Sequence, residues 1–150
     1  AVLAPTADSS PARSRLVARI LSTTTRLLLG LPLLVFGLNG FLNFIPPPST
    51  PLPEPAMTFV GALVSSGYMM PLIAVTHLIV GALLVANRFV PLALVLLAPF
   101  LVNSVAFHIF LERSGLPMAL VFCALELHLV WVHRRSFLPL LTARADHNSN

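Results

Sequence analysis

Four long apolar runs, separated by short polar joints, dominate the pattern of hydrophobic and polar positions along the chain. They cover residues 27–45, 69–86, 89–111 and 116–132. Each run has the length that a helix needs to cross about 30 Å of hydrocarbon. Pro99 lies inside the third run, where it should kink the helix. The pattern predicts an all-α integral membrane fold, an antiparallel bundle of four transmembrane helices.

A proline-rich segment separates the first two apolar runs. Residues 46–55 contain six prolines, which is typical of a stiff extended stretch. Residues 56–66 are largely apolar but too short to span a bilayer, and Gly67 follows as a helix-stop signal. We therefore expect a short interfacial helix between spans 1 and 2.

The ends of the chain differ from its middle in composition. Residues 1–14 are rich in Ala, Pro, Ser and Thr, which predicts a disordered N-terminal tail. The first apolar run follows four arginines and has no small-residue cleavage site, so we do not expect a signal peptide. The predicted domains are the N-terminal tail, a transmembrane domain over residues 15–140, and a C-terminal tail over residues 141–150.

The arginines lie asymmetrically about the predicted spans. If the N-terminus is inside, eight of the nine arginines fall inside, and only Arg113 falls outside. Cytoplasmic loops of membrane proteins carry an excess of basic residues. The distribution predicts a multi-pass protein with both termini cytoplasmic and the proline-rich link on the outer side.

Composition supports a membrane environment and excludes other classes. The chain is 57% hydrophobic and 9% charged, with a mean hydropathy of +0.90. Soluble domains carry about 25% charged residues. The net charge of +4 comes from arginines beside apolar runs, without the aromatic and polar neighbours of a nucleic-acid site, so no nucleic-acid partner is expected. The single cysteine, Cys123, excludes a disulfide within the chain.

Five polar side chains inside or beside the spans form the candidate site, because polar groups at membrane depth are expensive. They are His77, Glu126, Asn103, Asn39 and His108. His77 and Glu126 lie near the middles of their spans, and the two amides lie about 4 to 5 Å further outward. We predict that Glu126 contacts His77, directly or through one water. The five residues are a candidate polar core or quinone site.

Structural roles remain open for the same residues. Asn39 and Asn103 are expected to act as interhelical glue, and the His77–Glu126 pair is either functional or structural. His128 should lie on a different helix face from Glu126, toward a partner subunit, a pigment or lipid headgroups. Small residues at Gly37 and Gly40 would let a neighbouring helix approach closely.

Cofactor motifs are sparse. Haem is disfavoured because His108 lies much nearer the outer face than His77, and the chain has no C-x-x-C-H motif. Cys123, Glu126 and His128 lack a shared helix face, so no metal site is predicted. No residue is assigned as catalytic. The expectation is no cofactor in this chain, with quinone as the alternative.

Several segments resemble DoxX-like membrane proteins. The resemblance rests on RLLLGLPLLVFGLNGFLNF at residues 26–44 and on the motifs NRFVPLAL, APxxVN and FHxFL, and it covers residues 15–140. It implies a four-helix protein of the bacterial inner membrane, with some relatives in thiosulfate–quinone oxidoreductases and other membrane oxidoreductase assemblies. The family commonly has Glu in the pattern E-x-x-x-G-x-L-L, where this chain has His77 before Gly81.

These observations predict a small accessory or structural subunit of a respiratory or photosynthetic membrane complex. The alternative is a quinone-linked oxidoreductase subunit that uses the His77–Glu126 pair to handle protons. The expected partners are the lipid bilayer and other membrane subunits. Transport is disfavoured, because four spans without an inverted repeat do not match the usual transporter plan.

Overall fold

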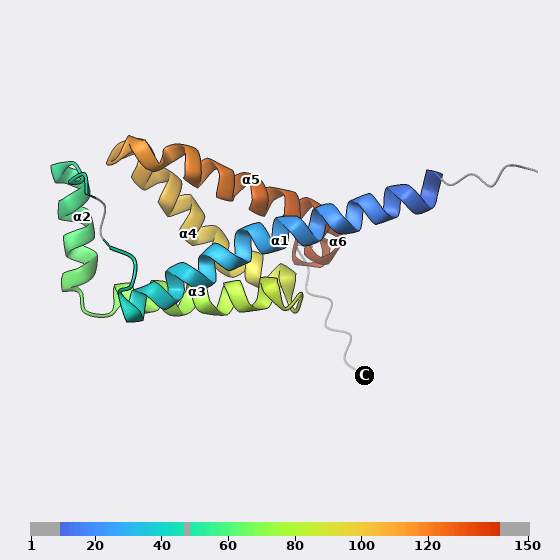
Figure 1. Ribbon diagram of the computed structural model, residues 1–150, viewed down its shortest axis with the longest axis horizontal. Helices are drawn as coiled ribbons and strands as arrows, with labels where there is room; N and C mark the ends of the chain where they lie inside the picture. Colours follow the sequence, from blue (N-terminus) through green and yellow to red (C-terminus); the bar gives the residue numbers. More distant parts are fainter. Residues whose placement is uncertain (1–9, 47–48, 142–150) are drawn as a thin grey trace, which may run out of the picture.

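The computed structural model describes residues 10–46 and 49–141, and all regular elements within them are helical. The helices are α1 (Ser10–Leu42), α2 (Glu54–Ser65), α3 (Met69–Val85), α4 (Val90–Phe110), η1 (Arg113–Gly115), α5 (Leu116–Val132), α6 (Arg134–Phe137) and η2 (Leu138–Leu141) (Figure 1). The all-α prediction is confirmed. Residues 10–14, which we expected in the disordered N-terminal tail, belong instead to α1. Residues 1–9 and 142–150, which fall in the two expected tails, lie outside the described residues.

Three helical segments are long and apolar enough to cross a membrane. They are Ala12–Leu42, Val90–Phe110 and Arg113–Val132. Helix α3 has 17 residues, a rise of about 26 Å, and passes the same test only together with α2. The break between α2 and α3 bends by 87°, so the described chain has three such spans, or up to four if the bent pair counts as one. This composition indicates a membrane protein.

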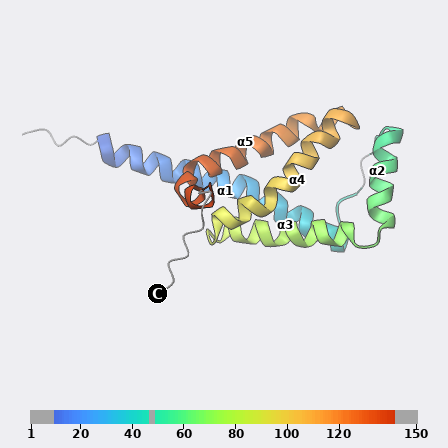
Figure 2. The same ribbon diagram turned by 180° about the vertical axis from the view of Figure 1, so that it is seen from behind.

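The four long helices form a ring around an aliphatic core. Helix α1 packs against α3 and α5, and α4 packs against the same two helices from the other side. Successive long helices run in opposite directions, which Figures 1 and 2 both show. The largest fully buried side chains come from all four helices: Leu29, Leu33, Val80, Leu84, Leu94, Leu97 and Leu129. The ring order places α3 and α5 diagonally across the core.

Glycines bring α1 and α3 into backbone contact. A Cβ atom at Gly81 would lie 2.9 Å from the carbonyl oxygen of Gly30 and 2.9 Å from the amide nitrogen of Leu34. A Cβ atom at Gly37 would likewise lie 2.9 Å from the carbonyl oxygen of Ala74. Small residues allow such close approach, which increases van der Waals contact between apolar helices.

Arg26 joins the same two helices by a polar contact. Its side chain is buried, and Nη1 donates a hydrogen bond of 2.9 Å to the carbonyl oxygen of Leu84. That oxygen belongs to the last turn of α3, where it also accepts a hydrogen bond of 3.2 Å from the backbone N–H of Asn87 and where the helix dipole favours a cation. Arg26 therefore stabilises the end of α3, a role that the sequence pattern did not indicate.

Helix α2 is the expected short helix between the first two spans. It stands beyond one end of the bundle, roughly across the direction of α3, as Figure 2 shows. The joint to α3 includes Gly67, whose φ of +75° suits glycine. Phe59 of α2 contacts Phe107 of α4, with ring centroids 5.7 Å apart. This contact ties α2 to the C-terminal half of α4, close to the candidate site.

Candidate functional site

A cavity of about 290 Å³ lies among α1, α3, α4 and α5. Its volume is close to the lower end of the range for small-molecule sites, about 300–1,000 Å³. The lining residues are Leu33, Phe36, His77, Phe100, Leu101, Ser104, His108, Gly115, Met118, Ala119 and Phe122. The walls are mainly aliphatic and aromatic, so His77, His108 and Ser104 supply its side-chain polar groups. The structure thus brings two of the predicted site residues, His77 and His108, to one cavity.

His77 occupies the cavity wall from α3. The residue is 7% exposed, and its ring meets the ring of Phe100 edge-on, with centroids 4.3 Å apart. Within the described part of the chain, its Nε2 atom is buried and has no hydrogen-bond partner. A buried polar atom without a partner costs about 1–3 kcal/mol. A ligand that hydrogen-bonds to Nε2 would recover that free energy.

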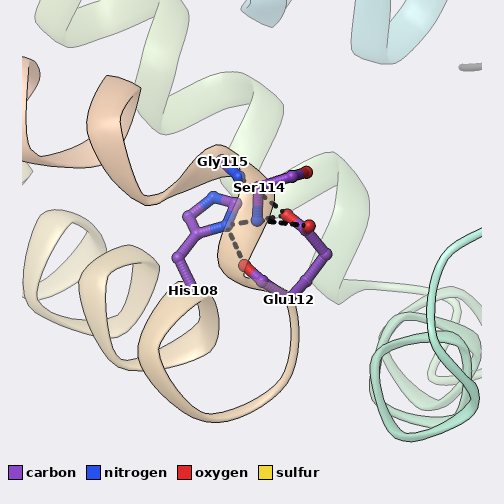
Figure 3. Close-up of polar contacts among 4 residues, drawn as sticks. All are labelled: His108, Glu112, Ser114 and Gly115. Carbon is purple, nitrogen blue, oxygen red and sulfur yellow. Dashed lines mark hydrogen bonds and ion pairs between the residues drawn. The ribbon is translucent and has the colours of Figure 1, made fainter.

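His108 reaches the cavity from the last turn of α4, and Glu112 holds its ring (Figure 3). The Nδ1 atom lies 2.8 Å from the main-chain carbonyl oxygen of Glu112 and 3.1 Å from its carboxylate Oε2. Both oxygens are acceptors, so Nδ1 carries the proton and donates. In the neutral ring, Nε2 is then left with a lone pair. The arrangement fixes one tautomer, because a hydrogen bond at one ring nitrogen decides which nitrogen carries the proton.

Glu112 is itself held by the turn that follows α4. Its carboxylate accepts hydrogen bonds from the backbone N–H of Ser114, at 2.7 Å, and of Gly115, at 3.0 Å. A hydrogen bond from the Ser114 side chain, then the backbone N–H groups and His108, lower the pKa of Glu112 from 4.5 to about 2, although partial desolvation opposes them. Glu112 is therefore an anion throughout the physiological pH range.

Gly115 leaves the space that the His108 ring occupies. A Cβ atom at this position would lie 2.6 Å from His108 Nδ1 and 2.8 Å from its Nε2. Real Cβ atoms essentially never come this close to other heavy atoms, so any larger residue would displace the ring. The sequence Glu112-Arg113-Ser114-Gly115 thus provides an acceptor, two backbone donors and a gap for one imidazole.

Glu126 lies elsewhere, and the predicted direct contact with His77 is wrong. Among the described residues neither side chain forms a hydrogen bond, and Glu126 lines a separate groove between α4 and α5. The reason is the direction that the side chains face, since His77 lines the cavity among the four helices and Glu126 lines the groove between α4 and α5. Similar positions along two helices do not bring residues together when they face different cavities.

The amides and His128 also lie outside the cavity lining. Asn39 Oδ1 accepts a hydrogen bond of 2.7 Å from the backbone N–H of Ile45, so it supports the turn after α1. Asn103 is exposed on α4, and it has no hydrogen bond within residues 10–46 and 49–141. The expectation that they act as interhelical glue is therefore wrong inside this chain. His128 is half-buried, with an Nε2 that also lacks a partner in the described chain.

Sequence reasoning missed Glu112, Ser114 and Gly115. The available signal was the spacing of His108 and Glu112, which places them one helical turn apart, followed by a Ser-Gly pair typical of a turn. No group of three or more His, Cys, Asp or Glu side chains that could hold a metal ion occurs among the residues that the structure describes. The polar chemistry of the cavity is therefore imidazole chemistry supported by one carboxylate.

Comparison with known proteins adds no assignment to this geometry. No protein-family model matches the chain, and no curated protein or solved structure matches it either. The DoxX-like resemblance of the sequence motifs therefore stays a prediction.

Proposed function

We propose that the chain crosses the bacterial inner membrane four times, with both termini in the cytoplasm. In this topology α3 is the second of the four spans along the chain, and α2 lies on the outer surface. The positions of the arginines support this orientation. Arg88 follows α3 and Arg134 follows α5, and both helices end at the end of the bundle where α1 begins (Figure 1). Arg113 precedes α5 at the opposite end. Reporter fusions that report an external C-terminus would contradict this orientation.

Within this topology, the cavity binds the head group of a lipid-soluble quinone or quinol, which makes the chain a quinone-binding subunit of a membrane oxidoreductase complex. One observation carries the proposal: His77 and His108 line one apolar cavity, and each has a ring nitrogen without a protein partner in the described chain. A quinol is an apolar ring with a hydroxyl at each end, which matches an apolar cavity with separate polar points. The predicted resemblance to DoxX-like proteins includes quinone-linked relatives, although this chain has His77 where that family commonly has Glu.

The side chains assign different roles to the two histidines. With Nδ1 donating to Glu112, the other ring nitrogen of His108, Nε2, is placed to accept a hydrogen bond and then the proton from a quinol hydroxyl. The carboxylate of Glu112 stabilises the imidazolium that forms, and the turn at Ser114 keeps that carboxylate ionised. His77 hydrogen-bonds to the ligand through Nε2 and keeps it away from the lipid. When bound, the quinol would supply the electrons, which a redox centre of a partner subunit would accept.

Binding of a short-tailed benzoquinol to the protein in lipid nanodiscs tests the proposal. His77→Gln and His108→Gln should each weaken binding about tenfold or more, because one buried hydrogen bond is worth about 1.4 kcal/mol or more. His133→Gln is the matched control, since His133 contacts the carbonyl oxygen of Leu129 outside the cavity lining. Equal affinity in all four proteins would refute the proposal.

An accessory role without a bound ligand is the second candidate, and Asn103 favours it. Its amide is exposed on a helix that is apolar over nearly its whole length, and lipid offers no hydrogen bond. A neighbouring subunit of a respiratory or photosynthetic complex would satisfy that amide. Mild purification should then recover other membrane subunits with the wild type and fewer with Asn103→Leu. Recovery of the chain alone from mild detergent would contradict this role.

A further inference from the structure

The far side of α4 carries a groove that the proposed quinol site does not use. It lies between α4 and α5 and encloses about 330 Å³. Its rim is exposed: Val102 is 72% exposed and Leu127 is 68% exposed. Its lining is apolar except for Cys123 and Glu126. Leu101 lines both this groove and the histidine cavity, so one side chain separates two sites of different chemistry.

Glu126 is a buried carboxyl group without a partner. The residue is 7% exposed, and its Oε1 atom has no hydrogen bond within the described residues. Among the described residues no arginine or histidine forms an ion pair with Glu126; the ion pair found there joins His108 to Glu112. A lone carboxylate in an apolar environment costs several kcal/mol, whereas a cationic hydrogen-bond donor offsets that cost. The groove therefore has the apolar walls for a hydrophobic body and one group that suits a cation.

We propose that the α4–α5 groove is a second binding site, open to the lipid, which takes a lipid-soluble amine through the carboxyl group of Glu126. The proposal rests on the proposed membrane insertion, and it is independent of quinol binding. The amine enters as a neutral molecule, and the proton of the carboxylic acid moves to its nitrogen. The O–H bond breaks, an N–H bond forms, and the resulting ion pair has no net charge.

An amine fits the groove better than an alcohol does. Both can donate a hydrogen bond, but only the protonated amine neutralises a carboxylate, and charge-assisted hydrogen bonds are about twice as strong as neutral ones. The groove volume is at the lower end of the range for small-molecule sites, about 300–1,000 Å³, which indicates a compact ligand. A basic side chain from a partner helix is a different occupant, and the experiment distinguishes it.

Labelling with dicyclohexylcarbodiimide in proteoliposomes tests the site. The acid of Glu126 adds across one C=N bond of this apolar reagent, with the carboxyl oxygen joining the central carbon and the proton joining a nitrogen, so nothing is released. Mass spectrometry should find the adduct on Glu126 in the wild type and lose it in Glu126→Gln. A water-soluble carbodiimide provides the comparison. It should label Glu54, an exposed acid on α2, and should spare Glu126.

Protection then identifies the ligand class. Dicyclohexylamine should slow the labelling of Glu126 at least tenfold, whereas dicyclohexylmethane, of the same shape without a donor, should not. The amine should also raise the thermal unfolding midpoint of the wild type more than that of Glu126→Gln. Equal protection by both compounds, or no labelling of Glu126, would overturn the proposal.

Labelling that appears only after extraction from native membranes would show a partner protein in the groove and would also overturn the amine proposal. Two measurements on the same preparations separate this failure from a failure of the proposed function. Quinol binding tests the histidine cavity, and resistance to alkaline extraction tests the insertion of the chain into the membrane.

Discussion

The contact between α1 and α3 makes a sharp prediction for Gly81→Ala. The added Cβ atom would lie 2.9 Å from Gly30 O and 2.8 Å from Leu34 Cγ, whereas ordinary contacts begin near 3.4 Å. The two helices must therefore separate by about 0.5 Å, the difference between those distances. Such overpacking costs about 1–3 kcal/mol. The higher helix propensity of alanine returns up to about 1 kcal/mol, so the expected net loss is about 1 kcal/mol.

Gly61→Ala is the matched control for this prediction. Gly61 lies in α2, and a Cβ atom there would have no neighbour within 4 Å. The same chemical change should therefore leave the free energy of unfolding unchanged or raise it by up to about 1 kcal/mol. Unfolding in mixed micelles by titration with dodecyl sulfate, followed by circular dichroism, measures both variants. If Gly81→Ala is as stable as Gly61→Ala, the backbone contact between α1 and α3 is refuted.

Three further predictions follow from the polar contacts. Arg26→Met should lower the free energy of unfolding by about 1.5–3 kcal/mol, because Leu84 O loses a charged hydrogen-bond donor. Arg19→Met, at an exposed position, is the control and should not lower it. Thermal unfolding of the two variants measures the difference. The pKa of Glu112 is lowered from 4.5 to about 2, so its stabilising effect is complete above pH 4.5 and is lost as the pH falls toward 2. The difference in unfolding midpoint between wild type and Glu112→Gln should therefore shrink over that interval, and a constant difference would contradict the role of the carboxylate. Gly115→Ala should weaken quinol binding by displacing the His108 ring, whereas Gly61→Ala should leave the dissociation constant unchanged.

The helices themselves were largely predictable from the sequence. The apolar run at residues 116–132 coincides with α5, and the runs at 69–86 and 89–111 agree with α3 and α4 to within one residue at each end. The first helix differs, because α1 begins at Ser10 and ends at Leu42, whereas the apolar run covers residues 27–45. The length of an apolar run and the positions of prolines predict the bounds of a helix, because both depend on that helix alone.

The site was predictable only in part. The polar residues inside or beside the spans included His77 and His108, but the depth count along each span predicted a contact between His77 and Glu126, which does not form directly. Helices α3, α4 and α5 are apolar on nearly all sides, so their sequences do not indicate which face meets which neighbour. For the same reason the exposed face of Asn103 could not be read. The support of His108 by Glu112 depends on the geometry of one turn, which residue types alone do not determine.

Photolabelling by an azido-quinone of the protein in lipid nanodiscs tests directly whether the cavity binds a quinol. The label should attach to the wall of the histidine cavity, at Met118 or Phe122, and excess quinol should prevent it. Label attached to Leu127 in the other groove, or unaffected by excess quinol, would contradict the assignment of the cavity as the quinol site.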